Sequence, residues 1–104
     1  MRQVGFYLDA GACSGCKACQ VACKDRNGLG TGVLWRRVYE VVGGGWRQEG
    51  AAWVQDVVAY NLSIGCNHCG RPICAEVCPA GAMQKRADGV VMLDRARCMG
   101  CGYC

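Results

Sequence analysis

The sequence has 104 residues, which is enough for one domain at most. Eleven of them are cysteines, a density that indicates either a disulfide scaffold or a metal protein. The formal net charge is +4, but the lysines and arginines are mostly scattered singly, which is typical of a solvated surface and does not indicate a nucleic-acid partner.

Neither a membrane span nor a secretory signal is indicated. No run of about 18 apolar residues occurs, so we expect no direct insertion into a membrane. The apolar start of the sequence meets Asp9 before the apolar region of a signal peptide would be complete. The cysteines are odd in number, and many are separated by only two residues, a spacing that cannot easily satisfy disulfide geometry. We therefore expect thiolates that bind metal.

The predicted secondary structure consists of short elements between cysteine loops. In chain order we expect a strand at 4–9, a helix over 19–24, a glycine-rich loop over 25–32, strands at 34–42 and 52–63 that form a long hairpin interrupted at 43–45, a helix near 75–77, and a second hairpin from 82–85 and 90–93. With 16 glycines and few large apolar residues, such a chain can build only a small core. The apo chain should therefore be largely unfolded.

The cysteines form three groups, which are the candidate ligands. The second group has the C-x2-C…C-x3-C-P pattern of bacterial iron–sulfur proteins, with Pro79 after its last cysteine and four residues before its third. Three thiolates in one short loop can hold three corners of an iron–sulfur cube, so we predict [4Fe–4S] clusters. The candidate ligands are Cys13, Cys16, Cys19 and Cys23, then Cys66, Cys69, Cys74 and Cys78, and finally Cys98, Cys101 and Cys104.

An internal repeat relates the first and third groups. Residues 8–19 and 93–104 share Leu-Asp, three residues, and then Cys-x-Gly-Cys-x-x-Cys. We expect Asp9 and Asp94 to cap a turn before each loop, and Gly15 and Gly100 to adopt a positive φ. A strand–loop–helix unit repeated in this way is the half-unit of a bacterial ferredoxin fold. The third group lacks a fourth cysteine, which would lie near position 108, so we expect the sequence to be the N-terminal part of a longer protein.

Several other residues allow two interpretations. His68 could bind iron, as histidine does in Rieske centres, but a hydrogen bond to sulfur or to a partner subunit is the expectation because cysteines surround it. Trp35, Trp46 and Trp53 could form a docking face or pack within the hairpin. No Ser-His-Asp set, paired carboxylates or phosphate-binding glycine motif is present, so we expect the protein itself to catalyse no reaction.

The whole sequence resembles the start of the iron–sulfur electron-transfer subunit, or B subunit, of the anaerobic dimethyl sulfoxide reductase family. The resemblance is carried by residues 5–9, 13–19, 23–25, 35–40, 43–44, 61–64, 66–69, 78–83 and 88–89. Lys24 stands where a simple ferredoxin has proline, and that departure is usual in this family.

The resemblance implies an α+β, ferredoxin-like double-cluster fold with short hairpins and helices, and a single domain over 1–104 with an inserted hairpin at about 34–63. It further implies a non-catalytic subunit whose [4Fe–4S] clusters, four in the full-length family, carry electrons from quinol. The quinol is oxidised in a membrane anchor subunit, and the electrons reach a molybdopterin-containing catalytic subunit. The protein would then lie peripherally at the cytoplasmic membrane within a complex, on either face.

The resemblance also pairs the second cysteine group with the third, and the first with a fourth group. It implies that Cys78 joins Cys98, Cys101 and Cys104 in the one complete site expected here. Two other functions stay open at this point. One is a stand-alone polyferredoxin, against which the long hairpin argues, since a minimal carrier needs no such arm. The other is a structural zinc module, although zinc sites usually separate their paired ligands by about a dozen residues or more.

Overall fold

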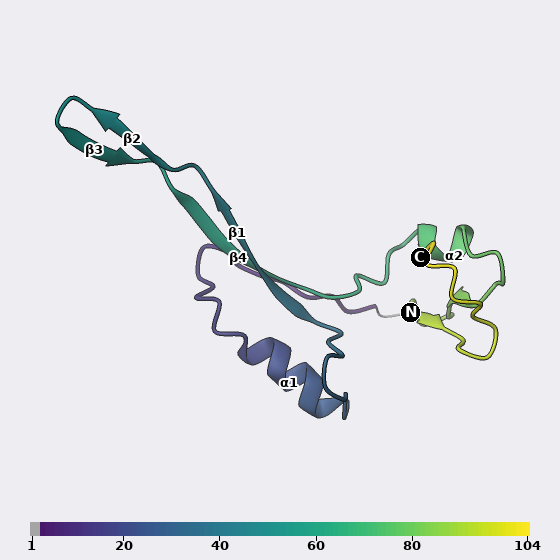
Figure 1. The fold of residues 1–104 in the computed structure, drawn as a ribbon. Helices are drawn as coiled ribbons and strands as arrows, with labels where there is room; N and C mark the ends of the chain where they lie inside the picture. Colours follow the sequence, from purple (N-terminus) through teal and green to yellow (C-terminus); the bar gives the residue numbers. More distant parts are fainter. Residues whose placement is uncertain (1–2) are drawn as a thin grey trace. The chain divides into compact units, whose positions relative to one another are not determined.

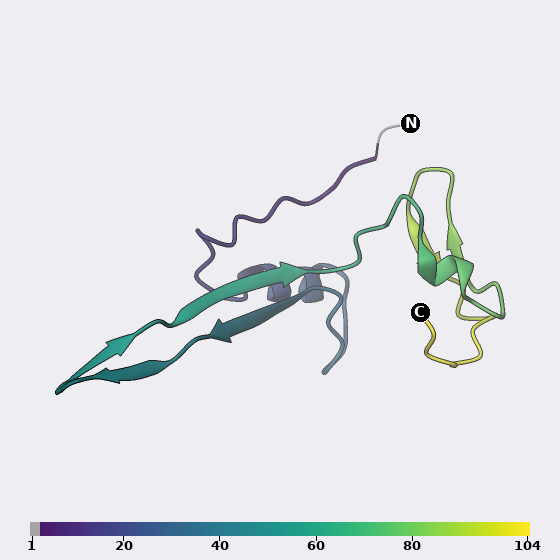
Figure 2. The same ribbon diagram turned by 90° about the horizontal axis from the view of Figure 1, so that it is seen from above.

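The structure is a computed structural model that describes residues 3–104 and divides them into two compact units. The hairpin unit is Phe6–Cys66, and the C-terminal unit consists of residues 3–5 with Asn67–Cys104. Both units combine a short helix with antiparallel strands (Figures 1 and 2). The prediction of a small α+β protein is confirmed at this level.

Helix α1, Ala18–Arg26, carries two cysteines in the hairpin unit. Its sequence contains alanine, glutamine, lysine and arginine, which favour helix, and its last turn holds Lys24 and Arg26, whose charges suit the negative end of the helix dipole. The Asn27 side chain closes the helix by donating to the Cys23 carbonyl at 2.8 Å. The helix predicted over 19–24 is therefore confirmed and extends one residue earlier and two residues later.

A long antiparallel hairpin follows α1 and leads away from it in both views (Figures 1 and 2). Strand β1, Arg37–Gly43, pairs with β4, Val58–Ile64, and β2, Trp46–Glu49, pairs with β3, Ala52–Gln55. The strands expected at 34–42 and 52–63 lie in this hairpin, with β2 as a further strand near its tip.

The two faces of the β1–β4 ribbon differ in what covers them. Val38, which pairs with Ser63, is only 8% exposed and lies on the face that meets α1 and its preceding loop. The opposite face presents Tyr39, Val41 and Tyr60, all of which are exposed. This ribbon therefore buries Val38 on one face and leaves these three side chains on the other face exposed.

The three tryptophans do not pack within the hairpin. Trp46 and Trp53 share one face of the β2–β3 ribbon by their register and are 65% and 63% exposed, and Trp35 is 55% exposed. The interpretation that they form the hairpin's own core is wrong for this structure.

The strand predicted at 4–9 is also wrong. These residues have no strand hydrogen bonds, and Phe6 and Tyr7 are 85% and 91% exposed. A strand exists only where a neighbouring strand accepts its backbone hydrogen bonds, and an apolar pattern does not supply that neighbour. Phe6 instead lies against the Arg36 guanidinium, 4.4 Å from the ring centroid.

The C-terminal unit contains the second predicted hairpin. After Pro72, the single-turn helix α2 spans Ile73–Glu76, and strand β5, Met83–Lys85, pairs with β6, Val91–Leu93. The hairpin expected from 82–85 and 90–93 is confirmed. Its packing is thin: within residues 3–104 the buried apolar side chains are Val38, Ala82 and Val91.

Gly44 sets the join between β1 and β2, and its replacement should weaken the hairpin. Its φ is +74°, and a Cβ would lie 2.2 Å from the Asp56 carbonyl oxygen. We predict that Gly44→Ala costs about 1–2 kcal/mol, because an L residue is strained there, and speeds exchange of the Asp56 amide roughly 5- to 30-fold. That amide donates to the Gly45 carbonyl at 3.0 Å, so hydrogen exchange at this position measures the opening of the join.

Gly45→Ala is the matched control. A Cβ at Gly45 meets no atom within 4 Å, and its φ lies outside the left-handed region. The control should leave the Asp56 exchange rate near that of the unmodified protein. Equal exchange rates in the two variants would contradict the assignment of the join to Gly44.

Candidate metal centre

The first and third cysteine loops begin with the same turn, as the repeat predicts. The Asp9 carboxylate accepts from the Gly11 amide at 3.0 Å, and the Asp94 carboxylate accepts from the Ala96 amide at 3.0 Å. Each aspartate's carbonyl also accepts from the amide three residues later. Both aspartates therefore cap turns, which confirms the prediction made for them.

Several residues of the cysteine loops have a positive φ. Gly15 and Gly100, the shared glycines of the repeat, have φ values of +73° and +76°, as predicted. Among the described residues, Lys17 and His68 are the non-glycine residues with positive φ, and both stand next to or between cysteines. Strained backbone of this kind costs of order 1–3 kcal/mol and is often found at functional sites. The first and second cysteine loops thus each contain one strained non-glycine residue.

Four cysteines line one cavity in the C-terminal unit. They are Cys78, which follows α2, and Cys98, Cys101 and Cys104 from the end of the sequence. Met83 and Leu93, from the β5–β6 hairpin, contribute to an almost wholly apolar lining. The structure therefore brings together the four residues that the resemblance assigns to a complete site. That they bind one cluster stays a prediction.

The backbone around Cys78 favours a thiolate. The amides of Met83 and Ala82 point at its sulfur and lower the pKa of the Cys78 thiol, and the Ala82 nitrogen lies 3.3 Å from Sγ. The thiolate is the form that binds metal. A set of cysteine sulfurs with backbone N–H donors and an apolar wall suits an iron–sulfur cluster, whose potential depends on such hydrogen bonds and on exposure to solvent. The residues of this cavity fit the predicted cofactor.

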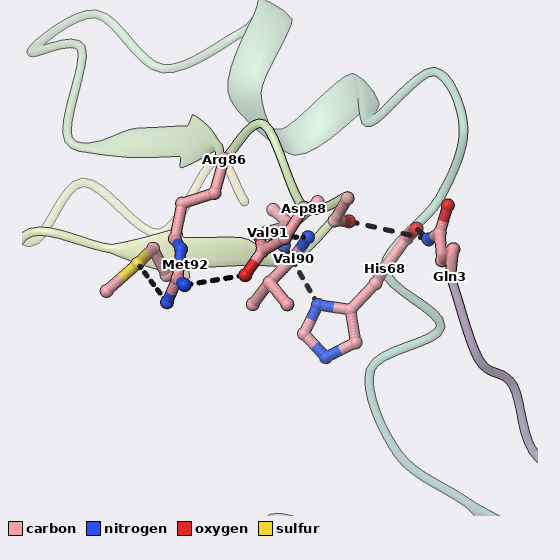
Figure 3. Close-up of polar contacts among 8 residues, drawn as sticks. Gln3, His68, Arg86, Asp88, Val90, Val91 and Met92 are labelled. Atoms are coloured by element: carbon pink, nitrogen blue, oxygen red, sulfur yellow. Dashed lines mark hydrogen bonds and ion pairs between the residues drawn. The ribbon is translucent and has the colours of Figure 1, made fainter. Parts of the chain in front are cut away.

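The second cysteine loop is tied to the β5–β6 hairpin by two side chains. Lys85 Nζ donates to the carbonyls of Cys69 and Gly70 at 2.8 and 2.9 Å. His68 Nδ1 accepts from the Val91 amide at 2.9 Å, and the His68 carbonyl accepts from Gln3 Nε2 at 3.1 Å (Figure 3). The ring nitrogen of His68 is therefore engaged by strand β6, a role that the sequence did not reveal because the partners are 23 residues apart.

The first cysteine group lies in the hairpin unit, on α1 and the loop before it. Cys19 and Cys23 are four residues apart on α1 and thus on one side of the helix. The backbone amide of Ala18 and the hydroxyl of Ser14 lower the pKa of the Cys16 thiol. Cys19 Sγ lies 3.1 Å from Ser63 Oγ, and Cys23 Sγ lies 3.7 Å from the Asn27 side-chain nitrogen. Each of these sulfurs has a hydrogen-bond donor within reach.

The other predicted ligands are distributed between the units. Cys66 is the last residue of the hairpin unit, whereas Cys69 and Cys74 belong to the C-terminal unit. Across residues 3–104, which include all eleven cysteines, no disulfide forms. In the same range no three side chains of histidine, cysteine, aspartate or glutamate converge as the ligands of a single metal ion would. The thiolates of a cube bind different irons, so they do not need to meet at one point.

Comparison with known proteins supports the same cofactor. A 4Fe-4S dicluster domain matches residues 57–104, which contain the second and third cysteine groups and therefore all four cysteines of the cavity. The protein thus binds [4Fe–4S] clusters. In the described part of the sequence, no helix combines the length and apolar character required to span a bilayer.

Curated relatives cover nearly the whole sequence. It is 53% identical over 102 residues to the probable anaerobic dimethyl sulfoxide reductase chain YnfG of Escherichia coli. This match covers 98% of this chain and 50% of that protein. It is 52% identical over 105 residues to the B subunit of the anaerobic dimethyl sulfoxide reductase of Haemophilus influenzae, covering 100% of this chain and 51% of that protein. It is 41% identical over 102 residues to the formate dehydrogenase iron-sulfur subunit of Wolinella succinogenes, covering 98% and 46%.

The chain spans about half the length of the curated relatives it matches. Their similarity extends through all three cysteine groups and the hairpin between them, because it covers nearly every residue of this sequence. The predicted resemblance is confirmed: this is a [4Fe–4S] protein homologous, over nearly its whole length, to the iron–sulfur B subunits of anaerobic dimethyl sulfoxide reductases.

Proposed function

We propose that this protein carries electrons through [4Fe–4S] clusters from a membrane subunit that oxidises quinol to a molybdopterin-containing catalytic subunit, and that it has no catalytic role of its own. The observation that carries the proposal is the set of four cysteines around one apolar cavity inside the matched dicluster domain. The relatives support it because their names place them in reductase and dehydrogenase complexes, as the B subunit or the iron-sulfur subunit.

Cys78, Cys98, Cys101 and Cys104 hold one cluster in this proposal. When bound, a [4Fe–4S] cluster supplies reversible one-electron oxidation and reduction. The protein's own residues determine how readily that happens. The Ala82 amide donates toward the Cys78 sulfur, which offsets the negative charge there, and Met83 and Leu93 present apolar surface to the cavity and limit the access of water.

The remaining cysteines hold further clusters in the same manner. Two-cluster ferredoxins cross-ligate, so that three cysteines of one group take the fourth cysteine of another. By this rule Cys66, Cys69 and Cys74 form one set of three, and Cys13, Cys16 and Cys19 form another. Cys23 then serves a cluster of a different group and does not close the cluster of its own loop.

The proposed partners also imply where the protein lies in the cell. A membrane anchor subunit on one side and a catalytic subunit on the other would hold the protein peripherally at the cytoplasmic membrane. The alternative of a stand-alone polyferredoxin differs from this in one measurable respect, since a carrier that diffuses between enzymes does not stay bound to any one of them.

The first test is the composition of the protein isolated without oxygen from its native host. We expect a brown protein with broad visible absorption, equal amounts of iron and acid-labile sulfide, and EPR signals that appear on reduction. A molybdopterin-containing subunit should co-purify with it. Isolation of the protein alone would favour the stand-alone ferredoxin, and a colourless protein that contains zinc would overturn the proposal.

The second test separates cross-ligation from ligation within one group. In the anaerobically reconstituted protein, Cys78→Ala should lower the bound iron by about four atoms per molecule, because it opens the four-cysteine site. Cys23→Ala is the matched control, since it removes a half-buried cysteine that also follows a cysteine loop, and it should leave the iron content of that site unchanged. Iron and acid-labile sulfide analysis measures both. Cys78→Ala loses iron under either scheme, so Cys23→Ala is the variant that decides. If Cys23→Ala also loses the iron of a cluster, the first group closes its own cluster and cross-ligation is wrong.

A further inference from the structure

The base of the long hairpin contacts a cysteine of the first group through one serine. Ser63, on strand β4, has its hydroxyl oxygen 3.1 Å from Cys19 Sγ and 3.2 Å from Nη1 of Arg36. All three residues belong to the hairpin unit. Ser63 therefore links Arg36, at the base of the hairpin, to the sulfur of Cys19 through two consecutive polar contacts.

The direction of these hydrogen bonds follows from the groups themselves. A guanidinium can only donate, so the Ser63 oxygen accepts from Arg36. A metal-bound thiolate can only accept, so the Ser63 proton is directed to the Cys19 sulfur once that cysteine is a ligand. The positive charge of Arg36 polarises the hydroxyl and strengthens its donation, because consecutive hydrogen bonds reinforce one another.

Other contacts hold this arrangement in place. The Phe6 ring lies 4.4 Å from the Arg36 guanidinium and favours that cation over its face. The Val38 amide, directly across from Ser63 in the ribbon, donates to Gln20 Oε1 at 3.0 Å. Arg36 is thus held in place by the Phe6 ring, and α1 is held against the ribbon by Gln20, the residue after Cys19.

The loop before α1 also fits closely against the same strand. A Cβ at Gly15 would lie 2.7 Å from the Asn61 side chain, so a larger residue would force that side chain to move, and the φ of +73° at Gly15 also favours glycine. Asn61 and Ser63 are two residues apart on β4 and therefore share a face. The hairpin base contacts the first cysteine loop at Gly15, Cys19 and Gln20, which is more than an incidental surface contact.

We propose that Ser63, oriented by Arg36, donates a hydrogen bond to the Cys19 sulfur and raises the reduction potential of the cluster held by the first cysteine group. A hydrogen bond to a ligand sulfur and a nearby positive charge both stabilise the extra electron of the reduced cluster. Ser63 is a positioning residue in this scheme, not a ligand. The inference rests on the proposed function, since the first group must hold a cluster.

The experiment is an EPR-monitored redox titration of the cluster-loaded protein. Loss of one signal in Cys16→Ala identifies the cluster of the first group. At the midpoint potential of the unmodified protein, Ser63→Ala should lower the ratio of reduced to oxidised cluster about tenfold, which is about 59 mV for a one-electron couple. Arg36→Met should shift the potential in the same direction. Ser63→Thr, which keeps the hydroxyl, should restore it.

Tyr60→Phe is the matched control, because it removes a hydroxyl from the opposite face of the same strand. If Ser63→Ala shifts the potential no more than this control, the inference is overturned while the proposed function stands. If no signal depends on Cys16, it is the proposed function that fails at this group, and the inference fails with it. If Ser63→Ala loads no cluster, Ser63→Thr decides. If Ser63→Thr loads the cluster at the midpoint potential of the unmodified protein, the role of the hydroxyl is supported. If Ser63→Thr also loads no cluster, Ser63 acts through packing alone and the inference is overturned.

Discussion

The binding of [4Fe–4S] clusters, which we propose the cysteine thiolates carry out, is the constraint on which this structure depends. Only Val38, Ala82 and Val91 are buried apolar side chains among residues 3–104, so burial of apolar surface contributes little to holding either unit together. In small metal-dependent domains the free energy of metal binding is also free energy of folding. The dense cysteines, the strained loop residues and the amides aimed at sulfur are consistent with a protein folded around its cofactors.

Much of the local structure could be predicted from the sequence, because it arises between near neighbours. The turns at Asp9 and Asp94, the positive φ of Gly15 and Gly100, and the helix that carries Cys23 all depend on interactions within a few residues. The cysteine spacing and the repeat likewise predicted the cofactor, which the matched domain and the relatives support.

What the sequence did not reveal depends on partners far away in sequence. Residues 4–9 have the composition of a strand, but no neighbouring strand pairs with them. The contact of His68 with Val91 spans 23 residues, and that of Cys19 with Ser63 spans 44. Neither spacing corresponds to a helix or strand period, so no pattern of apolar residues predicts them. The exposure of Trp46 and Trp53 is a further case, because composition alone does not determine which side of a ribbon is covered.

The hydrogen bond between His68 and Val91 has a consequence for how the C-terminal unit comes apart. Strand β6 runs directly into the third cysteine loop, and His68 belongs to the second, so the bond couples two loops that differ widely in sequence position. Lys85 adds a second link between the second loop and the same hairpin. Neither loop can detach from the β5–β6 hairpin without disturbing the strand that supports the other. The two loops should therefore open together as one cooperative unit, and partial damage at one of them would expose both to solvent and oxidants.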